Sequence, residues 1–243
     1  MIFIAGLLQL QGAYKTQERG TLKRLSIVLE ERTALFGGTF NPIHFGHLRV
    51  AEEVRERLGL RRVIFLPSNI PPLKTEDLAG STHRFSMVKE AIRGNTYFEV
   101  SDLECRRQGR SFTVDTLDEY RNLDPGRKPL FILGADAFLD IPGWHEPERL
   151  VALTDFVIVN RPGYSVKDIL QSPFIGGTLE SSEGEGIFKL VSGSLAVYVQ
   201  CSQLEISASD IRRRMKSGRS IKYLLPESVE FYIISKGLYS GSV

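Results

Sequence analysis

The feature that most constrains the fold is a short apolar run that ends in two glycines and leads into a helical pattern. Thr33–Phe36 reads as a buried strand and precedes Gly37-Gly38, after which apolar residues recur at helical spacing over about Gly46–Leu58. Gly59 stands where a left-handed cap would end that helix. A strand, a glycine turn and a helix form the first half of a βαβ unit, so we predict a mainly parallel sheet.

The same alternation continues along the chain. Five further segments are interpreted as strands, namely Arg62–Leu66, Tyr97–Val100, Leu130–Leu133, Phe156–Val159 and Ser194–Gln200. Helices are predicted at Ser81–Ile92, at Thr113–Arg121, from the capping-box sequence at Ser207 to about Gly218, and from Pro226 to Gly237. The polar, glycine-rich segment Ser181–Gly186 is interpreted as a surface loop. We therefore expect one α/β domain with five or six strands.

Composition excludes several classes of protein. Apolar residues make up 42% of the 243-residue chain and charged residues 25%, which is ordinary for a globular domain and unlike a disordered chain or a coiled coil. The 31 basic and 29 acidic side chains nearly balance, so we expect no nucleic-acid partner and only a small, locally held anion. The two cysteines, Cys105 and Cys201, form no metal-binding or disulfide pattern, which favours a reducing cytoplasm.

Residues 1–31 are treated as an amino-terminal extension that is expected to be poorly ordered, with the domain spanning 32–243. The apolar run Ile2–Leu10 follows no basic residue and is far shorter than the roughly 20 residues that a membrane-spanning helix needs. A signal peptide is the alternative, and no membrane partner is expected.

The segment Gly37–His47 carries the strongest chemical signal. Its glycines allow a ligand to approach the backbone, and the following helix directs its positive dipole end at the same place, which favours an anion. His44 and His47 flank that position and can donate hydrogen bonds to a phosphate, with Gly46 leaving space between them.

This segment resembles the HxGH signature of the nucleotidyltransferase superfamily, whose members transfer a nucleotidyl group to a phosphate-bearing acceptor. Three more segments are similar to elements of bacterial nicotinate mononucleotide adenylyltransferases: Arg107–Leu117, Leu133–Asp136 with Trp144-His145, and Ile206–Arg212. The resemblance covers Leu35 to about Ile234 and implies a single Rossmann-like, doubly wound domain with helices on both faces.

The resemblance implies adenylyl transfer from ATP to nicotinate mononucleotide in NAD biosynthesis, with Mg²⁺ entering on the triphosphate and no protein metal site. It assigns catalysis to His44, His47 and Arg212, and ATP binding to Gly37, Gly38, Thr39, Phe40, Gly134, Asp136, Ser207, Ser209 and Ile211. The residues that it assigns to the acceptor are Lys74, Phe112, Thr113, Trp144 and Arg161.

Several of these residues also have purely structural interpretations. Asp136 and Thr113 could each cap a helix, Trp144 could belong to the core, and Lys74 and Arg161 could be solvated surface residues. The chain also departs from the family pattern: Asn41 stands for an aspartate, Leu73 for a histidine, Phe112 for a tyrosine, and Ala208-Ser209 for Ser-Thr.

Alternative functions remain open at this point. Another phosphate acceptor within the superfamily would leave the reaction type unchanged, and a nucleotide-binding module without turnover would keep only the fold. An oligomer is compatible with the sequence.

Overall fold

The computed structural model describes residues 29, 31–70, 77–125, 128–182 and 184–240. Most of the predicted extension, together with Leu73 and Lys74, lies outside the described residues. Leu29 is fully buried in the core, and the N–H of Glu31 donates to the Gly59 carbonyl at 3.1 Å. The end of the predicted extension is therefore part of the packed structure.

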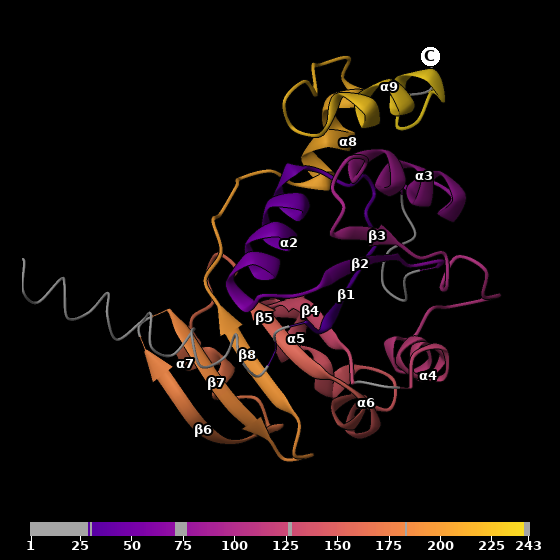
Figure 1. Ribbon diagram of the computed structural model, residues 1–243. Helices are drawn as coiled ribbons and strands as arrows, with labels where there is room; N and C mark the ends of the chain where they lie inside the picture. Colours follow the sequence, from indigo (N-terminus) through magenta and orange to yellow (C-terminus); the bar gives the residue numbers. More distant parts are fainter. Residues whose placement is uncertain (1–28, 30, 71–76, 126–127, 183, 241–243) are drawn as a thin grey trace, which may run out of the picture.

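The described part of the chain is built on one eight-stranded sheet (Figure 1). Six strands run parallel in the order β3 (Phe98–Val100), β2 (Arg62–Pro67), β1 (Thr33–Gly38), β4 (Leu130–Gly134), β5 (Asp155–Val159) and β8 (Leu195–Val199). The antiparallel strands β7 (Glu185–Leu190) and β6 (Ile175–Ser182) follow β8, and the pairing of β6 with β7 contains two register shifts. The predicted α/β class with a mainly parallel sheet is confirmed.

The predicted number of strands is wrong, as is the loop at Ser181–Gly186. Ser181 and Ser182 end β6, and Glu185 and Gly186 begin β7, so the segment spans a hairpin. Gly184 has a φ of 91°, which suits the turn between the strands. Polar residues at a hairpin tip resemble a loop in sequence because the strand pairing that orders them is not local.

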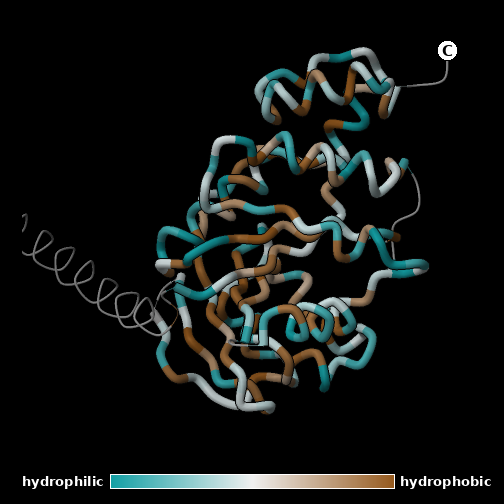
Figure 2. The backbone as a smooth tube through the Cα atoms, turned by 45° about the vertical axis from the view of Figure 1, so that its right-hand side comes forward, coloured by the Kyte–Doolittle hydropathy of each residue, from teal (hydrophilic) through white to brown (hydrophobic). Residues whose placement is uncertain are grey.

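Helices cover both faces of the sheet (Figures 1 and 2). One apolar cluster packs one face against α2 (Phe45–Leu58), α3 (Ser81–Ala91), α8 (Ala208–Lys216) and α9 (Glu227–Ser235). The other packs the opposite face against α4 (Thr113–Leu123), α5 (Ala135–Leu139), α6 (Pro147–Leu153) and α7 (Val166–Ile169). A short 3₁₀ turn, η1 (Ile141–Gly143), follows α5.

Each central strand contributes side chains to both apolar clusters, because successive side chains along a strand point to opposite faces of the sheet. In β1, Ala34 and Phe36 belong to the first cluster, whereas Leu35 belongs to the second. Figure 2 shows hydrophobic residues along the central strands and hydrophilic ones on the outer loops and helix surfaces.

Helix boundaries agree with the local signals. Gly59 caps α2 with a φ of 61°, and Ser207 caps α8 by accepting a hydrogen bond from the N–H of Asp210 at 3.1 Å. No helix in the described part of the chain is long and apolar enough to cross a membrane.

Candidate active site

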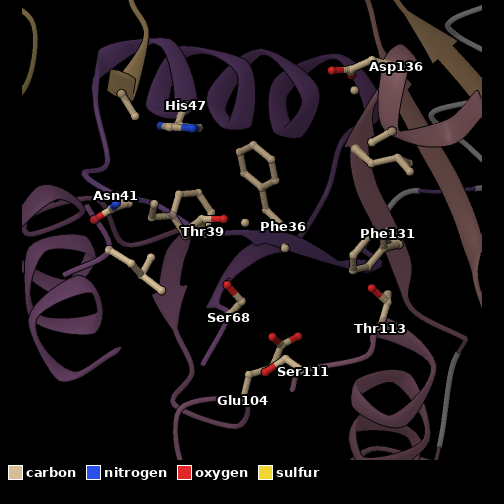
Figure 3. Close-up of a pocket in the computed structure, with 18 of the residues that line it drawn as sticks. Phe36, Thr39, Asn41, His47, Ser68, Glu104, Ser111, Thr113, Phe131 and Asp136 are labelled. Atoms are coloured by element: carbon tan, nitrogen blue, oxygen red, sulfur yellow. The ribbon is translucent and has the colours of Figure 1, made fainter. Parts of the chain in front are cut away.

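A cavity of about 790 Å³ opens where β1 and β4 end, at their carboxyl edges (Figure 3). The strand order reverses between these two strands, because the chain runs from β1 to β2 and β3 on one side and later from β4 to β5 on the other. Open α/β sheets bind ligands at such a reversal. The predicted ATP residues Gly37, Gly38, Thr39, Phe40, Gly134 and Asp136 all line this cavity.

Phe40 has a second role in the core. Its ring makes edge contacts with Phe36 and is only 2% exposed, while its φ of 45° turns the chain sharply after β1. Both Thr39 and Phe40 therefore line the cavity, and most of the Phe40 side chain is packed into the core.

His44 and His47 lie side by side at the start of α2. Their ring centroids are 3.8 Å apart, and the N–H of His44 donates to Nδ1 of His47 at 3.3 Å. Because Nδ1 of His47 accepts this bond, the neutral ring carries its proton on Nε2. His47 lines the main cavity, whereas the buried His44 lines an adjoining hollow of about 60 Å³.

Burial, and to a smaller extent the positive charge of Arg161, lowers the pKa of His44 to about 4. Its ring is therefore neutral near pH 7. Gly46 permits this placement, since a Cβ there would lie 3.0 Å from the His44 ring.

The first turn of α2 is less available to an anion than the sequence indicates. The N–H of Phe45 donates to the Leu224 carbonyl at 3.1 Å, and that of His47 donates to the His44 carbonyl at 3.0 Å. Side chains must therefore supply much of the hydrogen bonding to any bound phosphate.

The start of α8 brings a guanidinium to the turn that precedes α2. Arg212 donates to the Asn41 carbonyl at 2.8 Å and approaches the Ser209 hydroxyl at 3.5 Å, and both side chains line the cavity. Ser207 and Ile211 do not line it: Ser207 caps α8, and Ile211 is buried in the core.

Arg161, the predicted acceptor residue that follows β5, lies next to Asp136 in the cavity wall. Its Nε is 3.6 Å from Oδ1 of Asp136, and it lines both the main cavity and the His44 hollow. A Cβ at Gly134 would overlap the side chains of both Asp136 and Arg161, so glycine leaves room for them in these positions.

The predicted acceptor residues are divided between lining and supporting positions. Thr113, the first residue of α4, and Trp144, just after η1, both line the cavity. Phe112 does not line it, and its ring instead packs 4.4 Å from that of His145. The alternative in which Thr113 caps α4 is wrong, because the cap position is held by Phe112.

Sequence reasoning missed Arg84, which is fully buried in α3. Its guanidinium donates to the carbonyls of Thr39 (2.9 Å), Asn69 (2.5 Å) and Ala79 (2.8 Å), which belong to the two connections that follow β1 and β2. Removing the guanidinium from water lowers the pKa of Arg84. Because its partners are backbone atoms, no pair of oppositely charged residues in the sequence reveals it.

Asn41 is a second connecting residue. Its side-chain amide donates to the Asp77 carbonyl at 2.8 Å, and Oδ1 accepts from the N–H of Ala79 at 3.1 Å and from the Tyr239 hydroxyl at 2.6 Å. An aspartate at this position could not donate a hydrogen bond to the Asp77 carbonyl, whereas the amide of Asn41 does.

Glu104, Ser68 and Ser111 also line the cavity and were not predicted. Figure 3 places them on the side opposite His47. Their one sequence signal is that Glu104 and Ser111 follow the carboxyl end of a predicted strand. Among the described residues, no group of three or more His, Cys, Asp or Glu side chains could hold a metal ion.

Comparison with known proteins identifies the family. A family model described as cytidylyltransferase-like matches residues 35–214. A probable nicotinate-nucleotide adenylyltransferase from Geobacter metallireducens is 42% identical over 212 residues, covering 86% of this chain and 98% of the relative. One from Desulfitobacterium hafniense is 40% identical over 210 residues, covering 86% and 96%.

A solved structure agrees in fold. The Plasmodium falciparum nicotinic acid mononucleotide adenylyltransferase complexed with NaAD has a TM-score of 0.68 at 22% identity, covering 86% of this chain and 98% of that one. The resemblance seen in the motifs is thus confirmed over most of the described sequence. The chain belongs to the nicotinate-nucleotide adenylyltransferase family of cytidylyltransferase-like proteins.

Proposed function

We propose that this chain transfers the adenylyl group of ATP to nicotinate mononucleotide, giving deamido-NAD and pyrophosphate. The observation that carries the proposal is the cavity at the strand reversal, which His47, Arg212 and Arg161 all line. The relatives named as probable nicotinate-nucleotide adenylyltransferases, to which the chain is about 40% identical, support it. The cavity volume of about 790 Å³ lies in the range of small-molecule sites.

In the proposed reaction, an oxygen of the acceptor's 5′-phosphate attacks the α-phosphorus of ATP. The bond from that phosphorus to the bridging oxygen breaks, and pyrophosphate leaves together with the Mg²⁺ that entered on the triphosphate. A phosphate monoester whose second pKa is about 6 is already mostly a dianion at pH 7, so the step needs no general base. This chemistry suits a cavity that offers His47 as a hydrogen-bond donor and has no need of a base.

The chain's contribution is then positioning and stabilisation of charge. His47 would donate from Nε2 to an oxygen of the reacting phosphate, since its Nδ1 is used by the His44 N–H. His44, neutral because of its lowered pKa, would support that ring and face the triphosphate from the adjoining hollow.

Arg212 and Arg161 would neutralise the developing charge from two sides of the cavity. Ser209 would bind the triphosphate beside Arg212, and the backbone of Gly37–Phe40 would contact the nucleotide.

The acceptor's ring is assigned to the side of the cavity formed by Thr113 and Trp144. Trp144 offers a flat face for stacking, and the amino end of the 11-residue helix α4 favours a negative group at Thr113. We therefore expect nicotinate mononucleotide to be preferred over the uncharged amide. Lys74, outside the described residues, stays a predicted contact of the acceptor phosphate.

The test is pyrophosphate release from Mg·ATP with nicotinate mononucleotide, nicotinamide mononucleotide and 4′-phosphopantetheine supplied separately. We expect the first to be used best, and His47→Ala to lower kcat by about 10² to 10³, the usual effect of removing one well-placed donor. His83→Ala is the matched control, because His83 bonds the Tyr232 hydroxyl outside the cavity. If pyrophosphate is released only with 4′-phosphopantetheine, nicotinate mononucleotide is not the acceptor and the proposal is wrong on that point.

The reaction is expected to take place in a reducing cytoplasm, in keeping with the two unpaired cysteines, Cys105 and Cys201.

A further inference from the structure

Glu104 is a buried carboxyl group in the wall of the substrate cavity. It follows β3 in a turn, is 7% exposed, and contributes to the cavity lining together with Ser111. In Figure 3 its carboxylate is directed toward the interior of the cavity, across from His47.

Two hydroxyl groups form hydrogen bonds with this carboxyl group. Thr116 donates from Oγ1 to Oε1 of Glu104 at 2.9 Å, and the Ser111 hydroxyl provides a second hydrogen bond. None of the ion pairs within 4.0 Å in the described part of the chain involves Glu104.

Among the described residues, the two basic side chains that act electrostatically on Glu104 have other partners. Arg107 pairs with Glu119 at 2.6 Å and Arg84 donates to three carbonyls, so each acts on Glu104 only at longer range. Burial accordingly raises the pKa of Glu104.

A carboxylate is an unexpected group in this wall. Both proposed substrates carry negatively charged phosphates, which a nearby carboxylate would repel. One group in the two substrates is positive, namely the pyridinium nitrogen that joins the acceptor's ring to its ribose. A buried carboxylate that forms no ion pair with the described residues would be stabilised by that charge and would in turn hold the ring.

We propose that Glu104 is the counter-charge for the pyridinium ring of the acceptor, and so selects the cationic, oxidised ring over an uncharged one. The proposal rests on the proposed function, because it takes nicotinate mononucleotide as the acceptor. Ser111 stands two residues before Thr113, so a ring held at Thr113 and Trp144 lies beside the Glu104 side of the cavity.

The assignment divides recognition of the acceptor between two charges. The amino end of α4 attracts the ring's carboxylate, and Glu104 attracts the ring nitrogen. A ligand with both charges in that order is thereby oriented, with its 5′-phosphate directed toward His47 and Arg212.

The experiment compares kcat/KM for nicotinate mononucleotide and for its 1,4-dihydropyridine form, which keeps the carboxylate, ribose and phosphate but has a neutral ring. We expect wild type to prefer the cationic ring by about tenfold or more, equivalent to about 1.4 kcal/mol. Glu104→Gln keeps the size and the hydrogen-bonding oxygen but removes the charge, and should reduce that preference to about threefold or less. Its KM for ATP should stay at the wild-type value.

Glu99→Gln is the matched control, because Glu99 on β3 pairs with Arg62 on β2 and does not line the cavity. This variant should keep the full preference for the cationic ring. If Glu104→Gln lowers kcat/KM equally for both forms, Glu104 only shapes the wall and the inference is wrong, while the proposed function stands.

If wild type releases no pyrophosphate with nicotinate mononucleotide, the proposed function and this inference both fail. Should Glu104→Gln not fold, calorimetric Kd values of wild type for the two ring forms decide the question. Equal values would contradict the counter-charge, and a tenfold difference would support it.

Discussion

Replacing Arg84 with methionine tests whether one guanidinium holds the loops of the active site together. Methionine keeps much of the apolar stem of the side chain and removes all three hydrogen bonds, to Thr39, Asn69 and Ala79. Three carbonyls would then be left without their donor at a position that is fully buried.

The magnitude follows from those contacts. A hydrogen bond from a charged donor contributes about 1.5 to 3 kcal/mol, so the three bonds are worth at least about 4 kcal/mol. Burying the guanidinium costs free energy, as the lowered pKa of Arg84 indicates. Methionine carries no charge and avoids this cost, which offsets part of the loss. We expect the free energy of unfolding to fall by about 3 kcal/mol, a large share of the 5 to 15 kcal/mol typical of a domain.

Urea unfolding followed by circular dichroism measures this change. With an m-value of about 2 kcal/mol/M, the midpoint should shift by about 1.5 M. Arg93→Met, which removes an exposed arginine from the end of the same helical segment, should change stability by less than about 0.5 kcal/mol. A loss below about 1 kcal/mol for Arg84→Met would refute the reasoning, because it would mean that the three carbonyls find other donors.

Three further predictions concern His44, Asn41 and Ser207. The pKa of His44 is about 4 in the folded chain and 6.5 in the unfolded chain, because folding disfavours the protonated ring. The free energy of unfolding therefore has its full value above pH 6.5 and decreases as the pH falls toward 4. Urea titrations should show wild type losing up to about 3 kcal/mol more than His44→Asn over that range. Asn41→Asp removes the donor to the Asp77 carbonyl and should cost about 2 kcal/mol, measured by urea unfolding at pH 7. Ser207→Ala removes the cap of α8 and should cost about 1 kcal/mol without changing the KM for ATP.

Each of these has a contrary result. Parallel stability profiles for wild type and His44→Asn would mean that His44 titrates normally. Full stability of Asn41→Asp would mean that another group satisfies the Asp77 carbonyl, and a raised KM for ATP in Ser207→Ala would show that this hydroxyl binds nucleotide after all.

The parallel core of the sheet was predictable because its strands are continuous apolar runs. Phe156–Val159 was predicted within one residue of β5, and all five residues of β5 are buried. The edge hairpin was not predictable: β6 contains two glycines and several polar residues, and its pairing with β7 is what orders it. Local pattern carries little information where a strand has no buried face.

The site divides in the same way. The turn Gly37–His47 and the cap at Ser207 could be predicted because neighbouring residues encode them. The structure has a helix starting at each predicted position. Arg84 and Glu104 could not be assigned, because each is defined by groups brought from elsewhere in the chain. A buried charge is a property of the folded surroundings, and a lone arginine or glutamate in a sequence is far more often exposed.

The irregular pairing of β6 bears on how the protein behaves at high concentration. A strand at the rim of a sheet offers unpaired backbone groups to which a second molecule can add its own strand. At one rim β3 is only three residues long, and at the other the two register shifts of β6 interrupt its regular spacing of donors and acceptors. Neither rim therefore presents a long regular template, which protects an eight-stranded sheet against edge-to-edge aggregation.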